Sequence, residues 1–388
     1  MKLSHFKKYL LVALLIFLGS RNSVFPQIDL SFRQLSVNEG LSQNSAVSVT
    51  QDQDGFLWIA TQEGLNRYDG KDFKVFNKNF TDITQLSHFQ LGKVYADSKN
   101  RVWIIPDTSV PEKLNLSRDE FLPIAGINAA SCIKEDSEGN IWIGSFSGQL
   151  FKWNEAIQSF ELNWTDPSME IIDIDVFDEN NLLLTFKDAV AVWQVHTQST
   201  TFLVLPESNL NFSCSTLDSA GNIWIGTLNA GIWLVENGSY TARPIQVIFG
   251  DQDAAVSSNM VLDIREDSKG NIWAATYGGG VTRFNLKERS VINYTYSKQN
   301  PRSLHYNDVL CIFEDYTGTL WFGTDGAGLS FYDAFLEKFN FFQNQQVPED
   351  INIDVVRALY VDEYETIWIG TSGKGLTSYI PKSRSWKT

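Results

Sequence analysis

The chain has few of the residues that build metal centres and covalent cross-links. Its 388 residues include three cysteines, four histidines and three methionines. No Cys-x-x-Cys or His-x-x-x-His spacing occurs, so the sequence predicts neither a metal site nor a cofactor. A nucleophile elbow, a P-loop and a dinucleotide fingerprint are also absent, and we therefore expect no enzyme activity.

Positive charge and long apolar runs are scarce as well. Lysine and arginine number 31 against 46 acidic residues, for a net charge of −15. This balance disfavours nucleic acid and anionic membranes as partners. The one sustained apolar run, residues 9–18, follows Lys2, Lys7 and Lys8. It predicts a signal peptide over residues 1–27 and a periplasmic protein, with an uncleaved signal anchor as the alternative.

Tryptophan, by contrast, is plentiful and recurs in one phrase. The phrase is polar–Gly–x–apolar–Trp–apolar–Gly–Thr, as in DSAGNIWIGT, and its copies are 39 to 49 residues apart. An eighth copy has Leu183 in the place of the tryptophan. A repeat of this length is typical of β-propeller blades. We expect the repeated tryptophans to be scaffold residues buried between blades: Trp58, Trp103, Trp142, Trp224, Trp273, Trp321 and Trp368.

Each copy predicts four short strands, and the count of strands suggests how the ring closes. Phe32–Val37 (FRQLSV) is a lone apolar strand before the first copy, and it can complete the last blade as its fourth strand. The predicted fold is all-β: a seven-bladed β-propeller of four-stranded antiparallel blades over residues 28–335, after which residues 336–388 begin a second, truncated propeller. A single eight-bladed propeller is the alternative.

Glycine, aspartate and cysteine occupy fixed positions in these copies. Gly139, Gly221, Gly270 and Gly318 are expected at positive φ in the first hairpin turn, where the preceding aspartate bonds backbone amides. Cys132, Cys214 and Cys311 each lie ten residues before a tryptophan. Blades that are not neighbours cannot bring Cα atoms within disulfide range, so these cysteines predict a small slot rather than a cross-link.

The repeats resemble a known family. The segment 40–76, GLSQNSAVSVTQDQDGFLWIATQEGLNRYDGKDFKVF, and the phrase GTDGAGLSFYD at 323–333 are similar to the two-component regulator propeller repeat. That repeat forms the extracytoplasmic sensor region of bacterial hybrid two-component histidine kinases. The resemblance implies a sensor propeller that belongs to a longer protein with a second propeller, a membrane span and a kinase. It also implies a glycan-derived oligosaccharide as ligand and a homodimer as the active form.

A ligand site is predicted on the loops that enter the inner strands, because these loops lengthen in the later copies. The long segments are 250–259, 297–307 and 343–354. The candidate ligand-binding residues near them are Tyr277, Arg302, His305, Tyr306 and Asp325. Tyrosine rings suit stacking on a sugar, and the charged groups suit hydroxyls or a uronate carboxylate. A secreted propeller enzyme, such as a lyase, and a protein-interaction scaffold are the alternative functions.

Overall fold

The computed structural model describes most of the chain as short antiparallel strands. The described residues are 30–80, 92–115, 117–207, 209–245, 256–335, 348, 351, 353, 355–383 and 385–387. The predicted signal peptide lies outside them. The chain divides into two compact units, Met1–Asp333 and Ala334–Thr388, which are described separately. Within the described residues, no helix has the length and apolarity needed to cross a bilayer.

The described part of the first unit forms seven four-stranded sheets, or blades. Blades 1 to 3 are β2–β5 (Ala46–Gln51, Leu57–Thr61, Gly64–Tyr68, Phe73–Phe76), β6–β9 (Lys93–Ala96, Val102–Ile105, Glu112–Asn115, Glu120–Pro123) and β10–β13 (Ala130–Glu135, Ile141–Ser145, Gln149–Asn154, Ser159–Thr165). Blades 4 and 5 are β14–β17 (Ile171–Asp178, Asn181–Phe186, Val190–Gln194, Ser199–Phe202) and β18–β21 (Phe212–Leu217, Ile223–Thr227, Ile232–Val235, Arg243–Pro244). Blades 6 and 7 are β22–β25 (Val261–Glu266, Ile272–Thr276, Gly280–Asn285, Ser290–Tyr294) and β26–β28 (Val309–Glu314, Leu320–Thr324, Leu329–Tyr332) with β1 (Arg33–Leu35).

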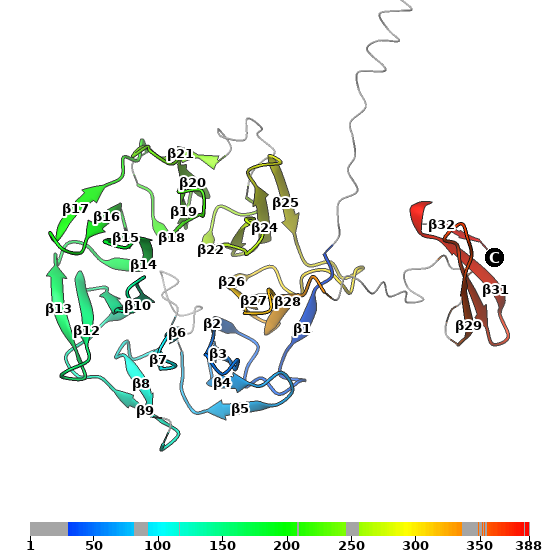
Figure 1. The fold of residues 1–388 in the computed structure, drawn as a ribbon, viewed down its shortest axis with the longest axis horizontal. Helices are drawn as coiled ribbons and strands as arrows, with labels where there is room; N and C mark the ends of the chain where they lie inside the picture. Colours follow the sequence, from blue (N-terminus) through cyan, green and yellow to red (C-terminus); the bar gives the residue numbers. More distant parts are fainter. Residues whose placement is uncertain are drawn as a thin grey trace, which may run out of the picture. The chain divides into compact units, whose positions relative to one another are not determined.

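The first strands of the blades surround a common axis (Figure 1). Each contacts the next in the order β2, β6, β10, β14, β18, β22, β26, and β26 contacts β2 again. The ring therefore closes after seven blades. The single eight-bladed ring, our alternative, is not formed, because the eighth sheet belongs to the second unit.

Ring closure uses the N-terminal strand, as the sequence predicted. β1 pairs antiparallel with β28, with Arg33 opposite Phe331 and Leu35 opposite Leu329. Phe32, just before β1, is 3% exposed and makes edge-to-face contacts with Tyr294 and Phe322. A single blade is thus built from both ends of the unit, which leaves no unpaired third strand in blade 7.

The repeated tryptophans fill the space between blades. In the first unit six of them are at most 6% exposed: Trp58, Trp103, Trp142, Trp224, Trp273 and Trp321. In blade 4 the equivalent Leu183 is also fully buried. The seventh, Trp368 in the second unit, is half-buried. The prediction of buried scaffold residues is therefore confirmed in the ring.

The turn glycines have the predicted geometry. Gly139, Gly221, Gly270 and Gly318 have φ between 78° and 84°. Asn100 (φ 59°) and Glu365 (φ 63°) take the same conformation where a copy lacks the glycine. Left-handed φ costs a residue with a Cβ roughly 1–2 kcal/mol, which explains why glycine recurs at this position.

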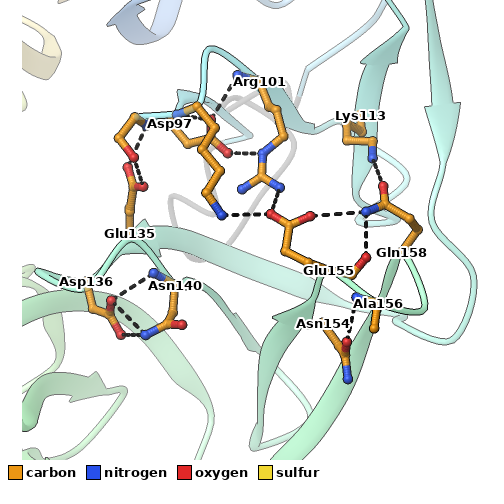
Figure 2. A network of polar contacts seen from close by, with 12 residues as sticks. Asp97, Arg101, Lys113, Glu135, Asp136, Asn140, Asn154, Glu155, Ala156 and Gln158 are labelled. Atoms are coloured by element: carbon orange, nitrogen blue, oxygen red, sulfur yellow. Dashed lines mark hydrogen bonds and ion pairs between the residues drawn. The ribbon is translucent and has the colours of Figure 1, made fainter.

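Polar contacts join neighbouring blades on the face that carries these turns. Figure 2 shows the junction of blades 2 and 3, where Ser98 donates its N–H and Oγ–H to the Glu135 carboxylate. Glu155 accepts from Lys99 at 2.9 Å and also pairs with Arg101. Partial burial raises the Glu155 pKa, but Lys99 and Arg101 outweigh this effect and hold the pKa at about 2. The same serine-to-glutamate contact recurs between later blades, as Ser219–Glu266 and Ser268–Glu314.

The three cysteines are buried and unbonded to one another. Each follows a bulge in an inner strand and lies opposite a glycine of the second strand. A Cβ on Gly226 would lie 2.7 Å from the Cys214 Sγ, and Gly144 bears the same relation to Cys132. A small residue on one strand makes room for sulfur on the other, which confirms the predicted slot.

The second unit contains one described sheet, β29–β32 (Val356–Val361, Ile367–Thr371, Gly375–Ile380, Ser385–Lys387), with a 3₁₀ turn at Pro381–Ser383. All of β29 is exposed, including Leu359 at 67% and Tyr360 at 66%. The inner strands of the ring, by contrast, bury these positions against a neighbouring blade.

Candidate ligand-binding face

The end of the ring opposite the aspartate turns has one backbone contact that recurs in the blades. The donor is the N–H of the residue four positions after the repeated tryptophan. The acceptor is the carbonyl of the residue thirteen positions before that tryptophan. Tyr277 donates to Met260 at 2.9 Å in blade 6, and Asp325 donates to Asp308 at 2.9 Å in blade 7. We call this end the loop face. In blades 1 and 3 to 7 the contact fixes one side chain at an equivalent place around the axis.

The side chains at this place differ strongly from blade to blade. The turn aspartate and the tryptophan are repeated, whereas this position holds, in blades 1 and 3 to 7, Gln62, Phe146, Lys187, Leu228, Tyr277 and Asp325. All six are half-buried. Repeated residues maintain the scaffold, so a half-buried position that changes while its backbone contact stays constant is a candidate for ligand recognition.

Three predicted site residues lie together on the loop face of blades 6 and 7. Burial raises the pKa of Tyr277, and the charges of Asp308 and Asp325 raise it further, with a smaller effect from Tyr306. Burial also raises the pKa of Asp308, while the Gly278 N–H at 2.7 Å opposes the rise. Two tyrosines and two carboxyl groups from separate loops therefore face one region.

Tyr306 and His305 are held by close contacts with blade 7. The Tyr306 ring rests on Gly326, where a Cβ would lie 2.9 Å from the ring Cζ. Tyr306 remains 40% exposed. His305 donates its backbone N–H to Ser330 Oγ at 3.2 Å, and its Nδ1 lies 3.0 Å from the same hydroxyl. Burial lowers the His305 pKa, which favours the neutral imidazole.

The fifth predicted residue, Arg302, bonds through its backbone to the segment that closes the ring. Its carbonyl accepts the Phe32 N–H at 2.9 Å, next to the closing strand. Arg302 is not among the charges that shift the pKa of Tyr277 or Asp308. The structure thus groups Tyr277, Tyr306 and Asp325 and places Arg302 beside the ring closure. Two of the long segments used in the prediction, 250–259 and 343–354, lie largely outside the described residues.

Sequence reasoning missed Asp308 and Ser330. Asp308 directly precedes β26, and Ser330 is a fully buried residue of β28. A signal was available: the residue sixteen places before the tryptophan is serine in blades 1 and 6 and His305 in blade 7. Ser42 and Ser257 donate their N–H groups to third-strand side chains just as His305 does.

A second polar cluster lies at the axis, on the inner strands. Lys93, Asp173, Asp263 and Arg265 come from blades 2, 4 and 6 and affect one another electrostatically. Burial raises the pKa of Asp173 to about 6, although Lys93 and Arg265 oppose the rise. Asp263 instead accepts the Ile312 N–H at 2.8 Å. That bond joins the cluster to the inner strand of blade 7.

Four of the repeats match a known protein family. The family model "Two component regulator propeller" matches residues 40–63, 126–147, 255–278 and 303–326. These matches fall on blades 1, 3, 6 and 7. A segment of 74 residues, 19% of this chain, is 39% identical to "Histidine kinase P4" from Formosa agariphila and spans 5% of that protein.

Solved structures share the fold at low sequence identity. The extracellular domain of a putative hybrid two component system from B. thetaiotaomicron has a TM-score of 0.64 and 19% identity. The alignment covers 92% of this chain and 54% of the solved chain. A second such domain from the same organism has a TM-score of 0.62, 16% identity, and coverage of 91% and 46%. Virginiamycin B lyase from Staphylococcus aureus has a TM-score of 0.61, 11% identity, and coverage of 78% and 98%.

The chain thus spans about half the length of the two-component domains that it resembles in fold. At these identities the lyase and the two-component domains show the architecture alone. The repeats distinguish the two groups, because the family matches lie at equivalent places in blades 1, 3, 6 and 7 and include loops of the candidate site. The four matched segments are therefore of the two-component regulator propeller type, in a ring whose fold is shared with the extracellular domains of two-component systems.

Proposed function

We propose that this chain is the extracytoplasmic, non-catalytic sensor propeller of a two-component signal transduction regulator, and that it binds a glycan-derived oligosaccharide on the loop face. The observation that supports the site is the variable position on that face, where a constant backbone contact presents a different side chain in six of the seven blades. A rigid ring that displays variable loops is a common way to build a binding surface.

The side chains of blades 6 and 7 suit a neutral or amine-bearing sugar. Tyr277 and Tyr306 provide rings for stacking, and carboxylates accept hydrogen bonds from hydroxyl or ammonium groups. Among the ion pairs of the described residues, none includes Asp308 or Asp325. Two carboxylates without a paired cation repel a uronate, so we favour uncharged and amino sugars over acidic ones.

Calorimetric titration with neutral, amino and uronate-containing oligosaccharides tests this function. We expect Tyr277→Ala to weaken binding by roughly ten- to hundredfold, because loss of one buried anchor costs about 1–3 kcal/mol. Arg302→Ala should have a smaller effect. Tyr240→Ala is the matched control, since Tyr240 is an aromatic residue, 60% exposed, beside the outer strand of blade 5.

The outcomes separate the site from the function. Binding that survives Tyr277→Ala and Tyr306→Ala unchanged would place the ligand elsewhere. A preference for uronates would contradict the charge argument. If no oligosaccharide in the panel binds even a chain extended by its following repeats, the sugar-sensing proposal fails.

We further propose that residues 1–27 direct export to the periplasm, that residues 336–388 begin a second propeller and that the full-length protein forms a homodimer. The exposed β29 supports the second point, because an inner strand with Leu359 and Tyr360 exposed needs a neighbouring blade. Osmotic-shock fractionation tests export: intact protein that includes residue 1 in the cytosol would contradict it. Slower hydrogen exchange of β29 in a chain extended by its next repeats would support the second propeller.

A further inference from the structure

The loop 297–307 bonds to β28 and to Phe32, the residue directly before β1. The Arg302 carbonyl accepts the N–H of Phe32, the residue that leads into β1. His305 bonds through its N–H and its Nδ1 to the Ser330 hydroxyl, in the middle of β28. β1 and β28 pair over only three residues. The loop therefore lies across the junction between the first and the last strands of the ring.

The loop is braced internally, so its two attachments are mechanically connected. Ser297 donates its N–H to Ser303 Oγ at 2.9 Å. Tyr296 donates its N–H to Asn307 Oδ1 at 2.7 Å, which ties the start of the loop to its end. Leu304, between the two attachment points, is fully buried. A braced segment with a buried anchor transmits a displacement better than a flexible one.

We propose that loop 297–307 is a clasp that couples occupancy of the loop face to the pairing of β1 with β28. The proposal rests on the proposed ligand face, because His305 and Tyr306 belong to both. A ligand that holds the loop in its observed position stabilises the β1–β28 pair, and a weakened pair lowers the affinity for the ligand by the same factor. β1 is where the chain enters the ring, and β28 is the last ring strand before it leaves. The clasp thus acts on the strand from which the chain leaves the ring for the second unit.

Hydrogen exchange followed by mass spectrometry tests the clasp without any ligand. Ser330→Ala removes the acceptor of the His305 N–H. We expect the amides of residues 33–35 and 329–331 to exchange at least about tenfold faster, because a three-residue pair opens locally once its brace is lost. Strands β10 to β12, in blade 3, should keep their wild-type rates.

Thr282→Ala is the matched control. Thr282 is fully buried at the equivalent place in blade 6 and accepts the Ser257 N–H at 3.2 Å through Oγ1. It does not pair with β1, whose partner is β28. We expect Thr282→Ala to leave the exchange of residues 33–35 unchanged.

His305→Ser keeps the backbone N–H and introduces the residue found at this place in blades 1 and 6. It removes only the imidazole, so we expect a smaller acceleration than that of Ser330→Ala. Wild-type exchange of residues 33–35 in both blade 7 variants, or equal acceleration in Thr282→Ala, would overturn the proposal. If Ser330→Ala does not fold, the hydrogen exchange of residues 33–35 in His305→Ser alone tests the proposal. Because no sugar is present, failure of the glycan proposal would leave this result unaffected.

Discussion

The indole N–H of Trp224 donates to Oδ2 of Asp218 at 2.8 Å. The other oxygen of that carboxylate accepts the backbone N–H groups of Ala220 and Asn222, at 3.0 and 2.8 Å. One aspartate thus holds the hairpin turn and satisfies the buried ring of the scaffold tryptophan. The same carboxylate–indole bond, between residues six positions apart, joins Asp52–Trp58, Asp97–Trp103, Asp136–Trp142, Asp267–Trp273, Asp315–Trp321 and Asp362–Trp368.

We expect Asp218→Ala to lower the free energy of unfolding by about 2–3 kcal/mol, because it leaves a buried indole donor unsatisfied and frees the turn. Asp178→Ala in blade 4 is the control: Asp178 is exposed, and the tryptophan position there holds Leu183. The control should cost under about 1 kcal/mol. Urea denaturation measures both, and equal losses would contradict a special role for the carboxylate–indole bond.

We expect Phe32 to contribute much of the stability that ring closure provides. Truncating a buried phenylalanine typically costs about 3–5 kcal/mol, and Phe32 is 3% exposed among three aromatic rings. We expect Phe32→Ala to melt far below the wild type and to aggregate more readily. Arg33→Ala, at the next residue of the chain and with an exposed side chain, should melt within a few degrees of the wild type. Thermal unfolding that does not distinguish the two variants would count against closure by this segment.

Asp173 should make stability depend on pH. Its pKa is raised to about 6 by burial, so its neutral form is favoured in the folded state. Its contribution to stability is therefore fully present below the unfolded value near 4 and is lost as the pH rises through about 6. We expect Asp173→Asn to raise the melting temperature at pH 8 by roughly 2–6 °C and by much less at pH 4.5.

Surface Asp178→Asn is the control for that titration and should show no such difference between the two pH values. A melting profile of Asp173→Asn parallel to that of the wild type from pH 4.5 to pH 8 would show that Lys93 and Arg265 already compensate the charge.

The thiols should be unreactive in the folded protein. Burial raises the pKa of Cys132 and that of Cys311 to about 12, and it also raises that of Cys214. Because the thiolate is the reactive form, we expect Ellman's reagent to titrate no thiol at pH 8 under native conditions and three after unfolding. Rapid labelling of even one cysteine without denaturant would show that its slot opens.

Much of the ring could be predicted from the sequence, because its strongest signals are local and repeated. The tryptophan phrase is set by the geometry of one blade: a turn that needs Gly139 at positive φ, an aspartate that caps it and a large ring that fills the gap to the next blade. Seven such copies must close on themselves, and an unpaired Phe32–Val37 strand is the natural partner for the last. The periodicity therefore sufficed for the architecture and for the role of β1.

The candidate site depended on contacts that no local pattern contains. Tyr277, Asp308 and Asp325 meet only because neighbouring blades bring loops some 30 to 50 residues apart to the same end of the ring. The backbone bond between Arg302 and Phe32 joins residues from opposite ends of the first unit, and ring closure alone makes them neighbours. Repetition in the sequence thus determined the blade. The tertiary structure decided which variable side chains face one another, because that depends on how the blades are placed around the axis.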